Sequence, residues 1–529
     1  MTPDVPTGRP MGWVGRLGPV TGRRFFWSTF ALFTVAGLCW TVATPLFNAP
    51  DEPQHVLRAV TVVRGEIAEP QVRGLPGGYT KARAAASFVS GSDAHCFAFE
   101  RDTPASCAHY SHSERVVSTA AEYGRYPPAY YLVVGVPSLA SSALNTVYAM
   151  RVVALLLVAA LLALGAASIA ELRERRIAAI GYAFAITPMA LFLGSIVNPS
   201  GVEIAAAISL WASGSVLAVQ SADRIDPRLA RRVGIAAAAL ALCRQLGPLW
   251  VAIIAVVVVV LAGRTGVRNL VQSRAARVWG ALVAISVVAQ VAWVALAGGL
   301  NLTNPGAASH DATSLVLRKS FGDSFRFLSQ MVGNFGWLDT PVPRGVFVTW
   351  VFVLGVLIVL ALSWSSRLRA GLLGGILALA VAIPIALEAS SAKGAGYLWQ
   401  GRYGLPLAAG VPIVAGILLA RSSNAPMLRG RLAGVLGGAF VFAQFLAFAQ
   451  SLRRSTVGYD GTFFFFVHPV WKPPVPVVLL LVVYLGVIAA VAVWLLWMPA
   501  LTGSASRDVD PPSSPSSDHV DVATTTNSL

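Results

Sequence analysis

Two adjacent carboxylates, Asp51 and Glu52, directly follow the first long apolar segment of the chain, in the sequence Asn-Ala-Pro-Asp-Glu-Pro-Gln-His that ends at His55. Carboxylates at a membrane surface are costly unless they are solvated or used. The pair is therefore a candidate general base, or a metal anchor, for a substrate that arrives from the lipid phase. The alternative is an ordinary polar flank in which Asp51 caps the start of a helix.

Arg244 and Gln245 interrupt another apolar segment. An arginine at membrane depth usually faces a protein-lined cavity or an anionic partner, and a lipid-linked phosphate is such a partner. The alternative is an arginine whose long side chain extends to the membrane interface.

A third polar group precedes an apolar segment late in the chain and contains Lys393, Trp399, Gln400, Arg402 and Tyr403. Such residues can stack on a sugar and hold a phosphate, although aromatic residues at this depth are also typical of an interfacial belt. Arg402 falls on the expected outer side, where the positive-inside rule does not require an arginine, and this favours a functional role.

Cys96 and Cys107 share one polar loop. In a loop that faces an oxidising compartment they predict a disulfide. A zinc site with His95, His109 and His112 is the alternative, but the spacing matches no standard ligand pattern.

Composition restricts the class of protein that can carry these groups. Of the 529 residues, 56% are hydrophobic and 12% are charged, with a mean hydropathy of +0.67. So few charges cannot cover a water-facing surface of this size, which excludes a soluble enzyme, a disordered chain and a secreted disulfide scaffold. The net charge of +16 comes from short arginine clusters between apolar segments. This pattern is typical of cytoplasmic loops and does not indicate nucleic-acid binding.

We expect an all-α polytopic membrane protein with about twelve transmembrane helices and both termini in the cytoplasm. Residues 127–144 are expected to lie flat on the outer face within the long first loop, because a crossing there would carry Arg173, Arg175 and Arg176 outside. The expected spans are 26–47, 148–170, 177–195, 201–220, 233–243, 247–262, 278–299, 346–363, 370–388, 404–420, 432–450 and 476–498. The short pair 233–243 and 247–262 is alternatively one broken helix or a re-entrant pair.

The domain organisation follows from these spans. We expect a cytoplasmic N-terminus over 1–25, one transmembrane domain over 26–500 and a disordered cytoplasmic tail over 501–529. Outer loops are expected at 48–147, 300–345 and 451–475.

These motifs, in this order, resemble the GT-C superfamily of membrane glycosyltransferases. More narrowly, the chain resembles the bacterial family of predicted membrane proteins designated domain of unknown function 2142. The matching elements are Pro50–His55, Tyr126–Tyr131, Asn198–Gly201, Arg244–Pro248 and Gln400–Pro406.

The resemblance implies a GT-C-like fold and an inverting glycosyltransferase in the bacterial plasma membrane, with its active site on the extracytoplasmic face. Its partners would be membrane lipids, a polyprenyl-phosphate sugar donor and an envelope glycan or glycolipid acceptor. Asp51 would be the catalytic base, with Glu52 as the alternative. The implied substrate-binding residues are His55, Asn198, Arg244, Gln245, Lys393, Trp399, Gln400, Arg402 and Tyr403.

The chain departs from the GT-C pattern at one position. Many such enzymes have a second acidic residue in the second outer loop, where this chain has Ser200, and Glu203 would lie one turn into the following span. We therefore prefer a reaction that needs no cofactor, with a divalent metal as the alternative.

Two other function classes remain open. A transporter or flippase of lipid-linked sugars would use the same arginines and aromatic residues without a base, and a non-catalytic envelope-assembly protein would need neither. The preference for arginine over lysine suggests a GC-rich genome, and bacteria of that kind often build arabinan, mannan or galactan polysaccharides. A pentofuranose and a hexose would use the same base and the same phosphate-binding groups.

Overall fold

The computed structural model describes residues 20–497, except for 77, 90–94, 224, 299–303, 305 and 426–430. The expectations for most of the N-terminal segment 1–25 and for the tail 501–529 lie outside the described residues.

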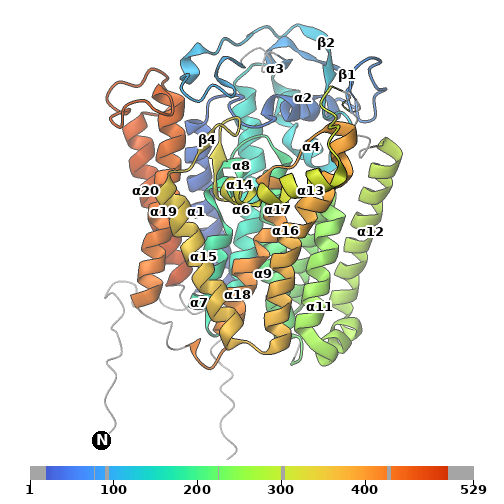
Figure 1. Ribbon diagram of the computed structural model, residues 1–529, viewed down its shortest axis with the longest axis vertical. Helices are drawn as coiled ribbons and strands as arrows, with labels where there is room; N and C mark the ends of the chain where they lie inside the picture. The colour runs from blue at the N-terminus through green and yellow to red at the C-terminus, as the bar shows by residue number, and fades with distance from the viewer. Residues whose placement is uncertain are drawn as a thin grey trace, which may run out of the picture.

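A bundle of long helices forms the body of the protein (Figure 1). Within the described residues, ten helical segments are long and apolar enough to cross a membrane. They are α1 (Gly22–Ala43), α6 (Thr146–Ile169), α9 (Pro199–Gln220), α11 (Gly247–Gln272), α12 (Arg274–Ala297), α15 (Arg344–Trp364), α16 (Arg367–Ala395), α17 (Gly401–Ala408) together with α18 (Gly410–Ala420), α19 (Arg431–Val457) and α20 (Val477–Leu496). The chain is an all-α polytopic membrane protein, as predicted.

The span expected over 177–195 is broken into α7 (Arg175–Ala185) and α8 (Pro188–Gly194), which meet at an angle of 64°. Proline cannot continue a helix without losing a backbone hydrogen bond. Pro188 instead begins α8, and the Thr187 hydroxyl caps it by accepting from the backbone N–H of Ala190 at 3.2 Å. Counting this pair as one span gives eleven.

The pair left open over 233–262 consists of two separate helices. They are α10 (Pro227–Cys243), which has 17 residues, and α11, which continues to Gln272. Asp226 begins α10 earlier than expected by capping it. Arg244 and Gln245 therefore lie in the turn between two helices, and α10 is not one of the ten candidate spans.

One end of the bundle, here called the loop end, carries the first long loop (Figure 1). Its strands β1 (Thr80–Ala85) and β2 (Val116–Ala121) pair antiparallel, with Thr80 opposite Ala121. The other elements of this loop are α2 (Glu52–Val62), α3 (Ala86–Val89), the 3-10 turns η3 (His95–Phe97) and η4 (Ala105–Cys107), α4 (Pro128–Val134) and α5 (Pro137–Ala140).

Residues 127–144 form no spanning helix. They fold into α4 and α5, which expose Leu132, Val136 and Leu139. Arg64 of the first loop holds this segment by donating to the Ser138 carbonyl oxygen at 2.6 Å. Short helices with outward apolar side chains fit a segment that lies on the bundle's surface, as expected from the charge pattern.

The later loops lie beside the first one. Residues 306–343 form α13 (Thr313–Gly322), α14 (Ser324–Val332) and a small hairpin of β3 (Asn334–Phe335) with β4 (Thr340–Pro341). The loop expected from residue 451 begins later, because α19 continues to Val457.

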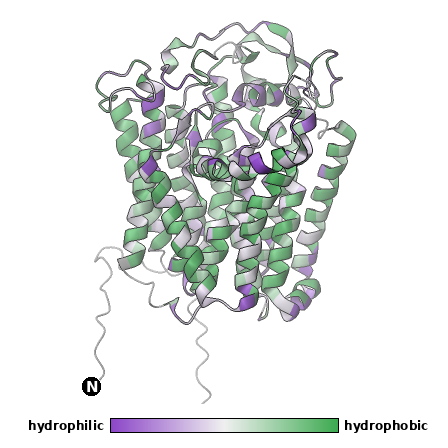
Figure 2. Ribbon diagram, in the orientation of Figure 1, coloured by the Kyte–Doolittle hydropathy of each residue, from purple (hydrophilic) through white to green (hydrophobic). Residues whose placement is uncertain are grey.

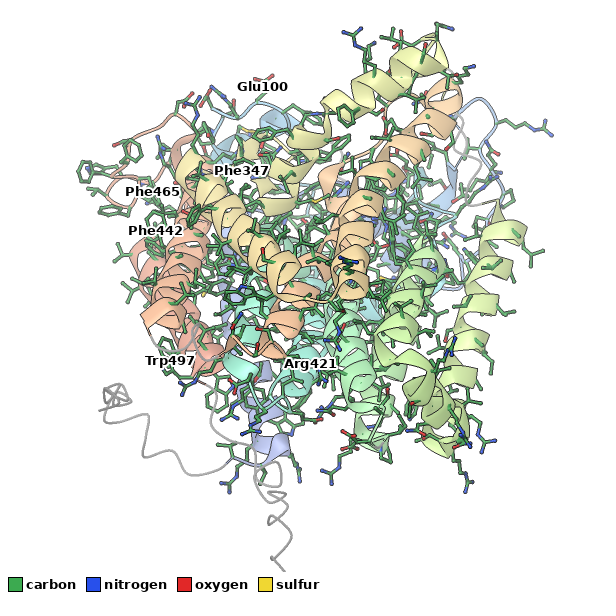
Figure 3. The ribbon with its side chains drawn as sticks, turned by 60° about the horizontal axis from the view of Figure 1, so that its bottom comes forward. Glu100, Phe347, Arg421, Phe442, Phe465 and Trp497 are labelled. Atoms are coloured by element: carbon green, nitrogen blue, oxygen red, sulfur yellow. A yellow bond between two sulfur atoms is a disulfide. The ribbon has the colours of Figure 1, made fainter. Side chains whose placement is uncertain are left out.

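Polar residues concentrate at the two ends of the bundle, and its middle is apolar (Figure 2). Arg421 marks the end opposite to the loop end, which carries Glu100 (Figure 3). We call this opposite end the arginine end, because the turns that join α9 to α10, α11 to α12 and α15 to α16, each with arginines in or next to it, lie there together with Arg421.

Helix α9 is the most buried of the long helices and packs against α6, α10 and α11. Small residues make such close packing of helices possible. Helices α7 and α18 also pack closely through a small residue. A Cβ atom added at Gly181 of α7 would lie 2.1 Å from the carbonyl oxygen of Pro412 in α18.

We predict that Gly181→Ala lowers stability by about 1–3 kcal/mol, because the methyl group overpacks the contact between α7 and α18. Gly375→Ala in α16 is the matched control, since a Cβ atom there meets no atom within 4 Å. Thermal unfolding of both variants in detergent checks this, and an equal unfolding temperature for the two would contradict it.

Candidate functional site

The two adjacent carboxylates face different partners. Asp51 has a left-handed backbone (φ 63°) at the first turn of α2, and its side chain accepts no capping hydrogen bond. It forms an ion pair with Arg402 of α17 and is 25% exposed. Glu52 is fully buried and pairs with Arg151 of α6. A helix therefore begins at Asp51, as the alternative expected, but the Asp51 carboxylate does not cap it.

Glu52 has no free oxygen for chemistry. Its carboxylate accepts from Nε and Nη2 of Arg151 at 2.7 and 2.6 Å, and from the backbone N–H groups of Phe47 and Val197 at 3.1 and 3.0 Å. The remaining Arg151 bonds go to the carbonyl oxygens of Thr41, Thr44 and Pro45. This buried pair joins α1, the first loop, α6 and the turn before α9, so Glu52 is a positioning residue.

Asp51 keeps a charged carboxylate at neutral pH. Burial by itself would raise its pKa, but nearby groups, Arg402 foremost, outweigh that effect and hold the pKa below its usual value. Arg402 is 1% exposed and also donates to the Tyr403 hydroxyl at 3.1 Å.

Arg244 joins this pair from the turn between α10 and α11. It donates to the Ser200 hydroxyl at 2.9 Å and lies 3.3 Å from the Glu203 carboxylate. Its guanidinium carbon is 4.7 Å from the ring centre of Tyr403, and that of Arg402 is 5.0 Å from the same centre. Arg244 therefore points into the protein, and the alternative of an arginine reaching the interface is wrong.

Several buried polar atoms in this region have no hydrogen-bond partner among the described residues. They are Nε of Arg244 and of Arg402, Nε1 of Trp399 and Oε1 of Gln400. The Trp399 ring packs edge-on against Tyr403 at 5.7 Å, so these atoms belong to one neighbourhood. Buried donors without partners are rare, and these three, two of which belong to the arginines themselves, suit a ligand with anionic oxygens.

His55 belongs to the floor of the site. Its Nδ1 lies 2.8 Å from the Tyr131 hydroxyl, and its ring stacks on Tyr123 at 4.8 Å. Burial, followed by the charges of Arg244 and Arg402, lowers the pKa of His55 to about 3, although Asp51 opposes the shift. The imidazole is therefore neutral and carries no charge for a phosphate.

Of the other predicted site residues, one orients the site, one lies next to a site arginine and one lies away from the site. Asn198 donates to the Pro50 carbonyl oxygen at 3.0 Å and caps α9, so it joins the first loop to the turn before α9. Gln245 is half-buried beside Arg244. Lys393 is exposed at the end of α16 and makes no hydrogen bond or ion pair with the described site residues, so the structure does not bring it to this site.

A metal does not suit these residues. No three potential metal ligands gather anywhere in the described part of the chain. Glu203, the nearest substitute for a second acidic loop residue, faces Arg244 and accepts from Nε1 of Trp250 at 3.2 Å. The two site carboxylates, Asp51 and Glu203, are each paired with an arginine.

Sequence reasoning missed Arg151 and Tyr123. Arg151 stands at the start of a long apolar segment, where arginine is common, so nothing marked it as the partner of Glu52. Tyr123 lies three residues before the Tyr126–Tyr131 motif, and this aromatic spacing was the available signal.

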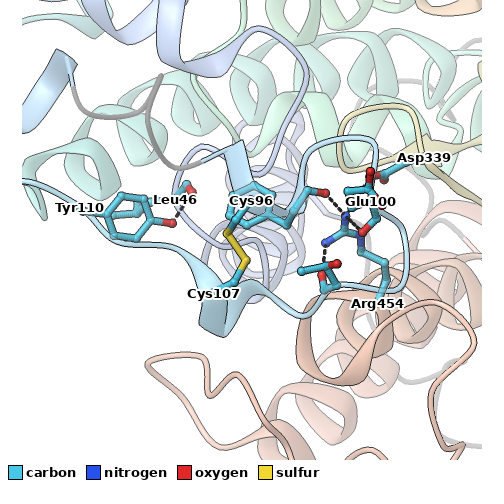
Figure 4. The surroundings of a disulfide bond; sticks show 9 residues. Leu46, Cys96, Glu100, Cys107, Tyr110, Asp339 and Arg454 are labelled. Atoms are coloured by element: carbon cyan, nitrogen blue, oxygen red, sulfur yellow. Dashed lines mark hydrogen bonds and ion pairs between the residues drawn. A yellow bond between two sulfur atoms is a disulfide. The ribbon is translucent and has the colours of Figure 1, made fainter.

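Cys96 and Cys107 form a disulfide, the pairing preferred from the sequence, so the zinc alternative is wrong (Figure 4). Buried Arg454 of α19 holds the disulfide loop by donating to the Phe97 carbonyl oxygen at 2.6 Å and to Asp339 at 2.8 Å. Arg454 thus joins the disulfide loop and the β3–β4 hairpin to α19.

A protein-family model described as a predicted membrane protein (DUF2142) matches residues 33–411. All the site residues from Asp51 to Tyr403 fall inside this range. No curated protein matches the chain.

We predict that Glu52→Gln and Asp51→Asn, the same chemical change at adjacent positions, differ sharply in stability. Glu52→Gln leaves Arg151 buried without a counter-charge, which costs roughly 3–5 kcal/mol. Asp51→Asn also leaves buried Arg402 without its carboxylate partner, but it costs less, because the Asp51 carboxylate is 25% exposed and Glu52 accepts four buried hydrogen bonds. Thermal unfolding and gel filtration in detergent compare the two, and equal losses would refute the division of roles.

Proposed function

The chain belongs to the DUF2142 family of predicted membrane proteins, and we propose that it is an inverting glycosyltransferase of the GT-C type. It would move a sugar from a polyprenyl-phosphate donor to an envelope glycan or lipid acceptor. The observation that carries the proposal is the meeting of one ionised, partly exposed carboxylate, Asp51, with two arginines whose buried Nε donors have no partner.

The arginines suit the phosphate of the donor. Arg244 and Arg402 approach the same ring of Tyr403, and each keeps an unpartnered Nε. Guanidinium groups bind phosphate through paired N–H donors, and they stabilise the charge that gathers on a departing phosphate. The indole N–H of Trp399 would donate to the phosphate or the sugar, and the Gln400 side-chain oxygen would accept from a sugar hydroxyl.

Asp51 suits the role of general base. The acceptor hydroxyl oxygen attacks the anomeric carbon, the bond from that carbon to the phosphate oxygen breaks, and the bonding electrons leave with the phosphate. Asp51 takes the hydroxyl proton, and the configuration at the anomeric carbon inverts. Glu52 cannot replace it, because both Glu52 oxygens are held by Arg151 and backbone N–H groups.

Because Asp51 is paired with Arg402, its strength as a base would depend on whether the donor phosphate is bound. While Arg402 holds Asp51, the pKa of the carboxylate is low and its oxygens are engaged. A phosphate that draws Arg402 away frees the carboxylate and lets its pKa rise, so that it becomes a better proton acceptor. Donor binding would thus activate the base.

No metal is needed for this reaction. The two arginines provide the positive charge that a divalent cation would otherwise supply to the leaving phosphate. Neutral His55 and the surrounding tyrosines would line the site without adding charge.

We place the site on the extracytoplasmic face of the bacterial plasma membrane. Two features support this orientation. The disulfide loop, which contains Glu100, lies at the loop end with α2, which Asp51 directly precedes (Figures 1 and 3), and disulfides persist in oxidising compartments. The arginine clusters lie at the opposite end, as cytoplasmic loops require.

This orientation predicts which engineered thiols an impermeant reagent reaches in intact cells. Asp460→Cys at the loop end should be labelled, whereas Arg421→Cys at the arginine end should be labelled only after permeabilisation. Both positions are exposed, and the native Cys39 and Cys243 are buried. The reverse pattern would overturn the orientation.

The activity is tested with the purified full chain, radiolabelled polyprenyl-phosphate sugars and a crude envelope glycan acceptor. We expect transfer by the wild type and a loss of about 10²–10⁴-fold in Asp51→Asn, the usual range for a lost general base. Asp460→Asn, which changes an exposed carboxylate at the same end, is the matched control and should keep full activity.

Three outcomes separate the function classes. Full transfer by Asp51→Asn would refute the base. Donor binding without transfer by any protein would favour a transporter of lipid-linked sugars. Neither binding nor transfer would favour a non-catalytic role in envelope assembly.

A further inference from the structure

An apolar groove opens on the side of the bundle next to the site. It encloses about 300 Å³ between α4, α6, α9 and α10, and nearly all of its lining is hydrocarbon. Its walls include Val133 of α4, Ala160 and Leu161 of α6, and Ile235 and Ala239 of α10.

The mouth of the groove faces the surface of the helix bundle. Val133 is 44% exposed and Ile235 is 37% exposed, and both line the groove. They lie on helices whose outward side chains are apolar, so the mouth opens toward membrane hydrocarbon and not toward water.

The inner end of the groove is connected to the site through two residues that directly precede site residues in the chain. Cys243 lines the groove and directly precedes Arg244, and Val202 lines it and directly precedes Glu203. The hydroxyl of Tyr130 also lies there, buried and without a hydrogen-bond partner among the described residues. The apolar groove therefore borders the two chain segments that carry Arg244 and Glu203.

We propose that this groove holds the first isoprenoid units of the donor's polyprenyl chain, with the phosphate at Arg244. The inference rests on the proposed function, because it assigns the tail of the same donor. A polyprenyl phosphate must keep its chain in hydrocarbon while its phosphate reaches the arginines. This groove joins those two environments, so the donor enters sideways from the membrane between α4 and α10.

A second cavity provides the control. It encloses about 420 Å³ between α9, α10, α11 and α12, and it is also lined by apolar side chains. Its lining includes Arg277, which lies near the start of α12, but none of the residues around Asp51 or Arg402. Filling it should therefore leave donor binding unchanged.

The test measures binding of undecaprenyl monophosphate and of the short analogue geranyl monophosphate to the full chain in nanodiscs of zwitterionic lipid. Ala239→Phe fills the groove, and Ala255→Phe fills the second cavity with the same side chain. We expect Ala239→Phe to weaken binding of the long chain by about tenfold or more, with a smaller effect on the short chain. Ala255→Phe should bind both as the wild type does.

Ala160→Phe, on the opposite wall of the groove, repeats the test should Ala239→Phe fail to fold. Wild-type affinity for the long chain in a folded groove variant would refute the groove while leaving the proposed function standing. A wild type that binds neither phosphate would remove both. Displacement of the long probe by phosphatidylglycerol at equal concentration would assign the groove to a two-chain phospholipid instead, which also overturns the inference.

Discussion

The buried ion pair between Glu52 and Arg151 is the constraint on which the site depends. Two charges inside a helix bundle are tolerable only when every lone pair and N–H group finds a partner, and here the partners come from α1, the first loop, α6 and the turn before α9. The pair fixes the start of α2 and thereby holds Asp51 in a left-handed conformation, with its carboxylate directed away from the helix it begins and toward α17. Glu52 therefore has a structural role, and its neighbour Asp51 faces the site.

The charges of the site are balanced in pairs, and this balance suits an anionic ligand. Asp51 neutralises Arg402, and Glu203 neutralises Arg244, while both arginines approach Tyr403 and retain an unpartnered Nε. A phosphate can therefore compete for guanidinium groups that are already oriented. The exchange would release the carboxylate that the proposed chemistry needs, which links binding to proton transfer through one shared arginine.

Hydropathy and arginine placement predicted the helical membrane fold and the surface position of 127–144, because both follow from the cost of putting charge into hydrocarbon. They missed the break between α7 and α8, since a hydropathy average does not register the Thr187–Pro188 signal. Short motifs indicated Asp51, Arg244 and Arg402, which lie together. They could not separate Asp51 from Glu52, because the difference depends on Arg151, a residue distant in sequence. Lys393 was included for its charge alone, and it lies exposed at the end of α16.

The central claim is that Arg244 and Arg402 hold the phosphate of a lipid-linked donor beside Asp51. The most direct measurement is a cryo-electron microscopy structure of the full chain in nanodiscs saturated with undecaprenyl monophosphate. The account predicts phosphate density in contact with both arginines, with Arg402 turned from Asp51 toward the phosphate. Phosphate bound elsewhere, with the pairs of Asp51 with Arg402 and of Glu203 with Arg244 both intact, would contradict it.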